Sequence, residues 1–243
     1  MLPTRVAPLF CYRTYTMIDI DRIYDLYYRP GEPITELLRK HSLQVATLAR
    51  EIALNNPHLP IDLTLLHEAA MLHDIGVFRT HAPSIHCHGD AHYMQHGIIG
   101  AALLRANGLE RHARVCERHI GVGLTANEII AQNLPLPPCD MLPETLEEKL
   151  VCYADNFFSK SHPDVQRTFT QVRNSIARFG NENIARFDAL AQLFGLVNNK
   201  ERQPAKGIEA LSLIIFILSD FIYCNPIPFA PLIGVFTRYT KNY

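Results

Sequence analysis

The sequence predicts an all-α protein. Apolar residues recur three or four positions apart over several long stretches, which is the spacing of amphipathic helices. No stretch alternates apolar and polar residues as a strand would, and no glycine-rich phosphate-binding loop or internal repeat is present in the sequence. The chain has 243 residues, 48% of them hydrophobic, which is enough for one large core.

Proline, glycine and asparagine divide the first half of the chain into separate helices. The pattern predicts helices over residues 17–31, 34–55, 62–75 and 96–107. Pro30-Gly31 closes the first of them. Asp62 is a suitable N-cap for the third helix, and Gly76 suits a C-terminal stop for the same helix.

The second half continues in the same manner. It is expected to hold helices over residues 110–120 and 145–158, and one or two more over 163–199 with a break near Gly180. Thr145 and Glu148 have the spacing of a capping box, which predicts the start of a helix there. Residues 132–143 contain four prolines and predict a connecting loop.

Composition changes at both ends, which predicts three parts. We expect a disordered extension over 1–16, a helical domain over 17–200 and an apolar tail of unknown role over 201–243. The tail is strongly apolar from residue 207, but Asp220 and three prolines interrupt it before the ~20 residues that a membrane span needs. A docked or interface segment is therefore favoured, while association with a membrane surface and a homo-oligomer stay open.

Charge and cysteine content narrow the class of partner and the compartment. The net charge is −1, which disfavours nucleic acid as a main partner because phosphate contacts need a basic field. The six cysteines lack CxxC spacing, which indicates reduced thiols. The N-terminus lacks the continuous apolar region of a signal peptide, so we expect a cytoplasmic protein.

Histidine and aspartate suggest a metal site. Most of the twelve histidines lie between His67 and His119, and His73-Asp74 lies at the end of a predicted helix, where the macrodipole favours a cation. Neutral imidazole with carboxylate suits iron, manganese, zinc, cobalt or nickel better than magnesium. Asp155 lies in an apolar stretch, where a carboxylate is costly unless it is paired or metal-bound.

Each candidate also has an ordinary interpretation. His41, on the helix before the His-Asp pair, could be a packed core or surface histidine. Asp155 could pair with Lys149 or Lys160. The order of the residues, with each on a predicted helix, favours a site over these alternatives.

Three short motifs, in this order, resemble the HD superfamily of metal-dependent phosphohydrolases, and most of all its small HDIG-domain proteins. They are His41-Ser42, His73-Asp74-Ile75-Gly76 and Ala154-Asp155-Asn156. The resemblance covers about residues 33–195. It implies an HD-domain helical bundle with a metal site at its centre.

The resemblance also implies which residues bind the metal. The positions that match the family's ligands for one divalent ion are His41, His73, Asp74 and Asp155. His96 and His119 lie where members with two ions have two further histidines, and Asp74 would then bridge the ions. One or two ions of iron, manganese, zinc, cobalt or nickel are therefore expected.

The activity that the resemblance implies is hydrolysis of a small, nucleotide-like phosphorylated molecule at a phosphomonoester, phosphodiester or phosphoanhydride bond. Asp74 is expected to orient or deprotonate the attacking water. Arg118 and Arg79 are candidates for neutralising phosphate charge, and each could equally be a solvated surface arginine. Val77-Phe78 replaces the acidic pair of the alarmone hydrolases, and the Gly-Tyr-Pro signature of cyclic-di-GMP phosphodiesterases is absent from the sequence.

Other interpretations remain open. The same ligands would serve a di-iron HD-type oxygenase, and a regulatory or binding module could keep a metal without catalysis. Residues 79–95 hold a second group of histidines, His86, His88 and His92, for which a mobile, solvated loop is expected. His81 or His86 could face the substrate, and His112 is expected on the surface.

Overall fold

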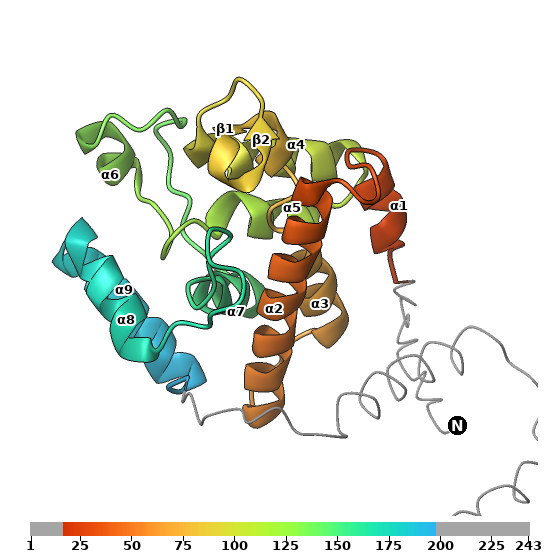
Figure 1. Ribbon diagram of the computed structural model, residues 1–243. Coiled ribbons are helices and arrows are strands. Elements are labelled where there is room, and N and C mark those ends of the chain that lie inside the picture. The colour runs from red at the N-terminus through yellow and green to blue at the C-terminus, as the bar shows by residue number, and fades with distance from the viewer. Residues whose placement is uncertain (1–16, 198–243) are drawn as a thin grey trace, which may run out of the picture. The chain divides into compact units, whose positions relative to one another are not determined.

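The computed structural model describes residues 17–197, so the predictions for 1–16 and for 201–243 lie outside the described residues. Over the described part the protein is all-α, as expected, with a single two-stranded ribbon (Figure 1). The α-helices are α1 (Ile20–Asp25), α2 (Pro33–Asn55), α3 (Leu63–Leu72), α4 (His96–Ala106), α5 (Glu110–Arg118), α6 (Ala126–Ala131), α7 (Leu146–Asp155), α8 (Phe169–Ile176) and α9 (Asn181–Phe194). The shorter elements are η1 (Val77–Arg79), β1 (His81–Ala82), η2 (Pro83–Ile85), β2 (Cys87–His88), η3 (Tyr93–Gln95) and η4 (Ala177–Phe179).

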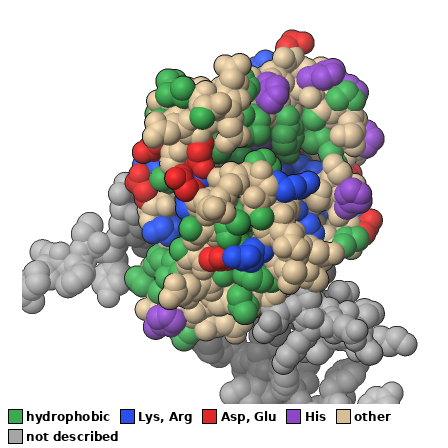
Figure 2. All heavy atoms as spheres, turned by 90° about the vertical axis from the view of Figure 1, so that its left-hand side faces the viewer, with side chains coloured by type: hydrophobic (Ala, Val, Ile, Leu, Met, Phe, Trp, Pro, Cys, Tyr) green, Lys and Arg blue, Asp and Glu red, His purple; other side chains and the backbone are tan. Residues whose placement is uncertain are grey.

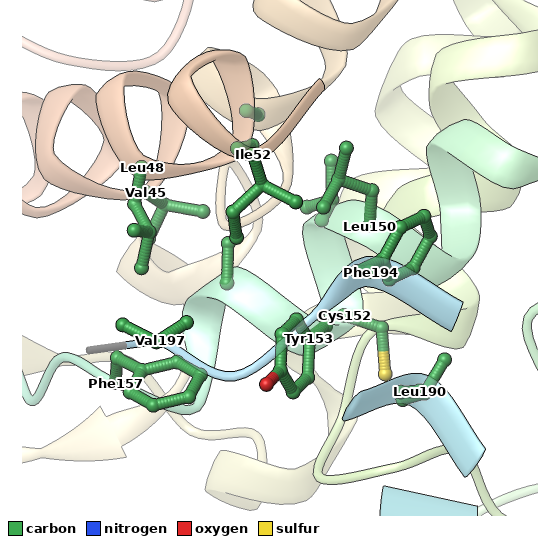
Figure 3. Close-up of a cluster of buried hydrophobic side chains, with 14 of the residues drawn as sticks. Val45, Leu48, Ile52, Leu150, Cys152, Tyr153, Phe157, Leu190, Phe194 and Val197 are labelled. Carbon is green, nitrogen blue, oxygen red and sulfur yellow. The ribbon is translucent and has the colours of Figure 1, made fainter. Parts of the chain in front are cut away.

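Helices α2, α3, α5 and α7 form the centre of this domain. Helix α2 lies along α3 and α7, while α5 packs against α3, α4 and α7. Figure 3 shows apolar side chains of α2, such as Val45 and Ile52, facing those of α7 and α9, such as Leu150 and Phe194. Burial of this apolar surface is the main force that holds the helices together.

A second core lies on the other side of α2 and α3. It includes Tyr24, Leu38, Leu72 and Leu104, which come from α1 to α4. On α2, Leu38 belongs to this second core and Val45 to the first, so His41 lies where the two cores meet. A polar residue at such a position is buried by packing on both sides.

The capping and breaking signals of the second half are confirmed. Thr145 Oγ1 accepts a hydrogen bond from the Glu148 backbone N–H, and the Glu148 carboxylate accepts one from the Thr145 backbone N–H. This is the expected capping box at the start of α7. The break between α8 and α9 falls at Gly180, whose φ of 106° favours glycine.

Gly76 does not act as the C-terminal stop of α3 that the sequence predicts. Helix α3 ends at Leu72, and Gly76 has φ −86° and ψ −5°, a conformation open to any residue. A Cβ at Gly76 would instead lie 2.3 Å from the His96 carbonyl oxygen and 2.4 Å from the Gly100 nitrogen. The glycine is therefore required for close packing against α4 and not for a left-handed stop.

Residues 79–95 also differ from the expected mobile, solvated loop. The β1–β2 ribbon pairs His81 with His88, the 3-10 helix η2 connects its two strands, and η1 and η3 flank it. Ile85 and Cys87 are buried, at 3% and 1% exposure. These two apolar side chains dock the segment onto the second core, although several of its histidines stay exposed.

No helix within residues 17–197 is long and apolar enough to cross a membrane.

Candidate metal centre

The six histidine and aspartate residues proposed as metal ligands come together in the structure. They are supplied by the ends of α3, α4, α5 and α7 and by the middle of α2. His41, His73, Asp74, His96 and His119 are all buried, while the Asp155 side chain is 19% exposed. The cluster thus joins residues that are up to 114 positions apart in the sequence, as His41 and Asp155 are.

Asp74 is the centre of this cluster. Its Oδ2 lies 3.3 Å from His41 Nε2 and 3.1 Å from His73 Nε2. Its Oδ1 lies 3.3 Å from His96 Nε2 and 3.5 Å from His119 Nε2. Each oxygen of one carboxylate therefore faces its own pair of imidazoles.

Asp155 completes the first of these two groups. Its Oδ1 lies 2.9 Å from His41 Nε2 and 3.5 Å from His73 Nε2. In the second group, the Nε2 atoms of His96 and His119 are 3.1 Å apart. Asp74 is thus shared between a group with two histidines and one further carboxylate, and a group with two histidines.

These distances fit metal coordination. Ligand atoms about 2.1 Å from one ion lie roughly 3.0–3.4 Å from one another in octahedral or tetrahedral geometry. His73 Nε2 and Asp74 Oδ1 are buried and have no hydrogen-bond partner among the described residues. Buried polar atoms in natural proteins are rarely left in this state, and a bound cation would satisfy them. The residues present therefore fit one or two divalent ions.

Three of the histidines are held by backbone carbonyls three residues earlier. The Nδ1 atoms of His73, His96 and His119 lie 2.7, 2.6 and 2.7 Å from the carbonyl oxygens of Ala70, Tyr93 and Cys116. If Nδ1 donates its proton to the carbonyl, Nε2 keeps a lone pair directed at the cluster. The local backbone thus sets the orientation that a metal ligand needs.

Electrostatics differ between the two groups of ligands. Burial lowers the pKa of His73, but Asp74 and Asp155 outweigh it and raise that pKa to about 10. Burial lowers the pKa of His96 to about 3, and the neighbouring His119 adds to this effect. Burial raises the pKa of Asp74, but His73 and Lys160 outweigh it and hold that pKa well below its usual range. Without metal, the group around His73 thus attracts positive charge more strongly than the group around His96.

Lys160 belongs to the same site, although the sequence offered it only as an alternative partner of Asp155. Its Nζ lies 2.5 Å from Asp74 Oδ2, and its side chain is 10% exposed. Burial lowers the pKa of Lys160, but Asp74 outweighs it and raises that pKa, so the ammonium stays protonated. The sequence signal for Lys160 was a lysine five residues after Asp155. Because this lysine lies in a loop, the helical pattern does not predict where its side chain points.

The structure does not bring Arg118 and Arg79 to the cluster. Arg118 Nη1 donates to the Leu142 carbonyl and to Glu144, both at 2.7 Å, so this side chain ties α5 to the loop before α7. Arg79 is exposed and lies over the Phe78 ring, with its Cζ 5.5 Å from the ring centroid. Neither arginine lines the cavity at the site.

The cluster opens into a cavity of about 400 Å³. His41 and Asp155 form its metal-ligand side, and its walls come from residues 82–85, Tyr93 and the segment 156–167. Lys160 and Arg167 are the cations that line this cavity. The sequence analysis predicted neither of them as a substrate-binding residue. A volume of this size is at the lower end of the range for small-molecule sites.

The remaining histidines take other roles. His81, His86, His88 and His92 are exposed and do not line the cavity. Figure 2 shows histidines along the upper and right-hand margin of one face, with lysine and arginine side chains nearer its middle. The expectation of a surface His112 is wrong, because this residue is 7% exposed and its Nε2 lies 3.0 Å from Glu68 Oε2.

The fold and the site define an all-α domain with a buried histidine–aspartate cluster that could hold metal ions beside a cavity. The chain belongs to the HD domain family, whose model matches residues 38–159. All six clustered residues lie within the matched stretch, whereas Lys160 and Arg167 lie beyond it.

Relatives are found among curated proteins of archaea. An uncharacterized protein of Methanocaldococcus jannaschii is 42% identical over 125 residues, which is 50% of this chain and 66% of the relative. A tRNA (cytidine(56)-2'-O)-methyltransferase of Thermoplasma volcanium is 34% identical over 162 residues, 66% of this chain and 42% of the relative. The methyltransferase of that name from Picrophilus torridus is 36% identical over 130 residues, 53% of this chain and 33% of the relative. The chain therefore matches only part of each of these relatives, and no solved structure matches it.

Proposed function

We propose that this protein is a metal-dependent phosphohydrolase acting on a small, nucleotide-like phosphorylated molecule. The observation that carries the proposal is the buried Asp74 carboxylate, which has a separate group of histidines at each of its two oxygens. The HD domain places the chain in a superfamily of metal-dependent hydrolases. The phosphorylated substrate and its nucleotide character are part of the proposal.

Two ion positions are proposed within the cluster. His41, His73, Asp74 and Asp155 would hold the first ion, and His96 and His119 with Asp74 would hold the second. Two sets of three residues have ligand atoms within 4.8 Å of one another, one with Asp155 and the other with His119, and both sets include His73. His96 is assigned to the second ion because its Nε2 lies 3.3 Å from Asp74 Oδ1 and 3.1 Å from His119 Nε2. Mixed nitrogen and oxygen ligands suit iron, manganese, zinc, cobalt or nickel.

When bound, such ions supply a water of lowered pKa and polarise a phosphoryl oxygen. Burial raises the pKa of Asp74 and of Asp155, but their neighbours outweigh it and hold both carboxylates ionised. Asp155 lines the cavity, where its carboxylate can accept a hydrogen bond from a water. Asp155 is the more accessible of the two, because its side chain is 19% exposed while that of Asp74 is fully buried. We therefore assign the orientation of the attacking water to Asp155, while Asp74 would hold the ions.

The names of two relatives support a nucleotide-like substrate. Both are tRNA methyltransferases, and the matching region covers 42% and 33% of their lengths. A domain matching this chain thus occurs in proteins that act on a polynucleotide. The net charge of −1 still favours a small phosphorylated molecule over a large nucleic acid as the main partner.

The proposal is tested by metal analysis of protein purified without oxygen, combined with a screen of phosphomonoester, phosphodiester and phosphoanhydride substrates. We expect about two ions per wild-type chain, with at least one lost and hydrolysis reduced ~100-fold or more in His96→Ala and in His119→Ala. His162→Ala changes an exposed histidine outside the cluster and serves as the matched control.

A wild-type protein with metal but without hydrolysis of any of these substrates would contradict the phosphohydrolase proposal. Iron together with oxygen consumption on an organic substrate would replace it with a di-iron oxygenase. Metal that is retained without either reaction would replace it with a regulatory or binding module.

A further inference from the structure

We propose that Lys160 and Arg167 form an anion-binding subsite at the floor of the cavity, which receives the phosphoryl group of the substrate. The inference rests on the proposed function and adds residues that lie outside the stretch matched by the family model. Both side chains line the cavity, together with the metal-ligand candidates His41 and Asp155.

Arg167 is the first observation. Its Nη2 donates to the carbonyl oxygens of Asn156 and Phe158, and its Nε is buried without a hydrogen-bond partner among the described residues. No carboxylate lies within ion-pair distance of Arg167 in the described part of the chain, although most other partly buried arginines there have one. Arg167 is half-buried, and a guanidinium at a cavity wall without a close counter-charge is a favourable place for an anion.

Lys160 is the second observation. Its ammonium is almost fully buried, and its close counter-charge is the Asp74 carboxylate at 2.5 Å. That carboxylate is also the residue shared by both proposed ion positions. Cations bound to Asp74 would compete with Lys160 for its negative charge, so the ammonium would require another anion within the cavity.

The chain holds both cations in place. The two ends of the segment 156–167 are joined by the Arg167 backbone N–H, which donates to the Phe157 carbonyl at 2.8 Å, two residues after α7. Gln44 of α2 donates to the Pro163 carbonyl at 2.8 Å, and Lys40 pairs with Asp164 at 2.5 Å. Lys160 and Arg167 are therefore presented by a loop fixed at several points, which reduces the ordering cost of binding a ligand.

The other lining residues suit the remainder of a phosphorylated molecule. Ser84, Ser159 and Ser161 offer hydroxyl groups, and Ile85, Tyr93 and Phe158 offer apolar or aromatic surface. An anion at Lys160 and Arg167 would place its attached organic group along these walls. The cavity lining therefore combines two cations with hydroxyl, apolar and aromatic groups, as expected for an organic phosphate.

The test is calorimetric titration of inorganic phosphate into the metal-loaded protein. We expect the Kd for phosphate to rise at least 10-fold in Lys160→Met and in Arg167→Gln, with partial recovery in Arg167→Lys. Lys149→Met removes one positive charge from α7 outside the cavity and should bind phosphate as the wild type does. Circular dichroism and metal content identify any variant that fails to fold or to load.

The outcomes separate this inference from the proposed function. Unchanged phosphate affinity in both variants, with a higher metal affinity in Lys160→Met, would overturn the subsite and leave Lys160 as a counter-charge for Asp74. Failure of the wild type to bind phosphate would also overturn it. Phosphate binding that depends on Lys160 and Arg167 in a protein without hydrolytic activity would support the subsite and contradict the phosphohydrolase proposal.

Discussion

Gly76 lies two residues after Asp74, and the reason for a glycine there is contact with α4. A Cβ at this position would meet the His96 carbonyl at 2.3 Å and the Gly100 nitrogen at 2.4 Å. Both contacts are to backbone, which cannot move aside as a flexible side chain would. The glycine thus sets the distance between Asp74 and His96.

We therefore expect Gly76→Ala to lower the free energy of unfolding by about 3 kcal/mol, at the upper end of overpacking effects. It should also reduce metal content, because relief of the clash displaces His96. Urea denaturation and metal analysis measure the two effects. Gly108→Ala is the control: it has open space and a φ of 74°, so only the backbone strain of about 1 kcal/mol applies. Equal effects of the two substitutions would contradict the packing explanation.

At the scale of single residues, the sequence predicts the six clustered histidines and aspartates but not the neighbouring cations Lys160 and Arg167. The histidines and aspartates stand at helix ends or on a helical face, so the helical pattern and the family motifs locate them together. Lys160 and Arg167 stand in an irregular segment, where side-chain direction depends on tertiary contacts such as those of Gln44 and Lys40. Arg118 was misplaced for a related reason, because its partner Glu144 lies in a loop.

The long helices follow from periodicity, whereas the short elements depend on their context. The predicted helix over 34–55 is observed as Pro33–Asn55, and the one over 96–107 as His96–Ala106. Helix α6 and the ribbon at 81–88 were not predicted, because they contain too few residues to display a period. The start of α6 nevertheless carries a capping box at Thr125 and Glu128, which was the available signal.

Glu128 links α6 to α9 and provides a prediction at the scale of the element. Its carboxylate accepts hydrogen bonds from the Thr125 backbone and from Asn183, and it pairs with Arg186. Burial raises the pKa of Glu128, but the Thr125 backbone and Arg186 outweigh it, so the pKa is lowered. A lowered folded-state pKa adds stability above the unfolded value of about 4.3, and this stability is lost as the pH falls through the folded-state pKa.

Glu128→Gln should therefore lower the free energy of unfolding by about 1 kcal/mol at pH 7, and this difference from wild type should shrink below about pH 4. Urea denaturation at several pH values measures it. Glu182→Gln, at an exposed position on α9, is the control and should have a small effect throughout. A difference that stays constant from pH 7 to pH 3 would contradict the assigned role of the carboxylate.

For the described domain as a whole, the ligand cluster joins elements from both cores. His41 comes from α2, His73 from the end of α3, His119 from the end of α5 and Asp155 from the end of α7. These residues do not meet in an unfolded chain, so metal binds the folded state preferentially. Metal binding should then stabilise the fold by mass action.

Chelation is therefore expected to lower the Tm by about 10 °C, since metal at ~1,000 times its Kd contributes roughly 4 kcal/mol. Thermal unfolding before chelation, after it, and after return of the metal measures this change. His162→Ala should respond as the wild type does, and His73→Ala should show a smaller dependence on metal. A Tm independent of metal in the wild type would contradict binding by the cluster.

The carbonyl partners of His73, His96 and His119 have a consequence for variation among related proteins. Each imidazole takes its orientation from its own turn of backbone, at Ala70, Tyr93 and Cys116, and not from a neighbouring side chain. Substitutions at the cavity wall, including those at Ser84, Ile85 or Phe158, thus leave these three anchors intact. Related proteins can therefore differ in substrate preference through their wall residues and still keep the same orientation of these three candidate metal ligands.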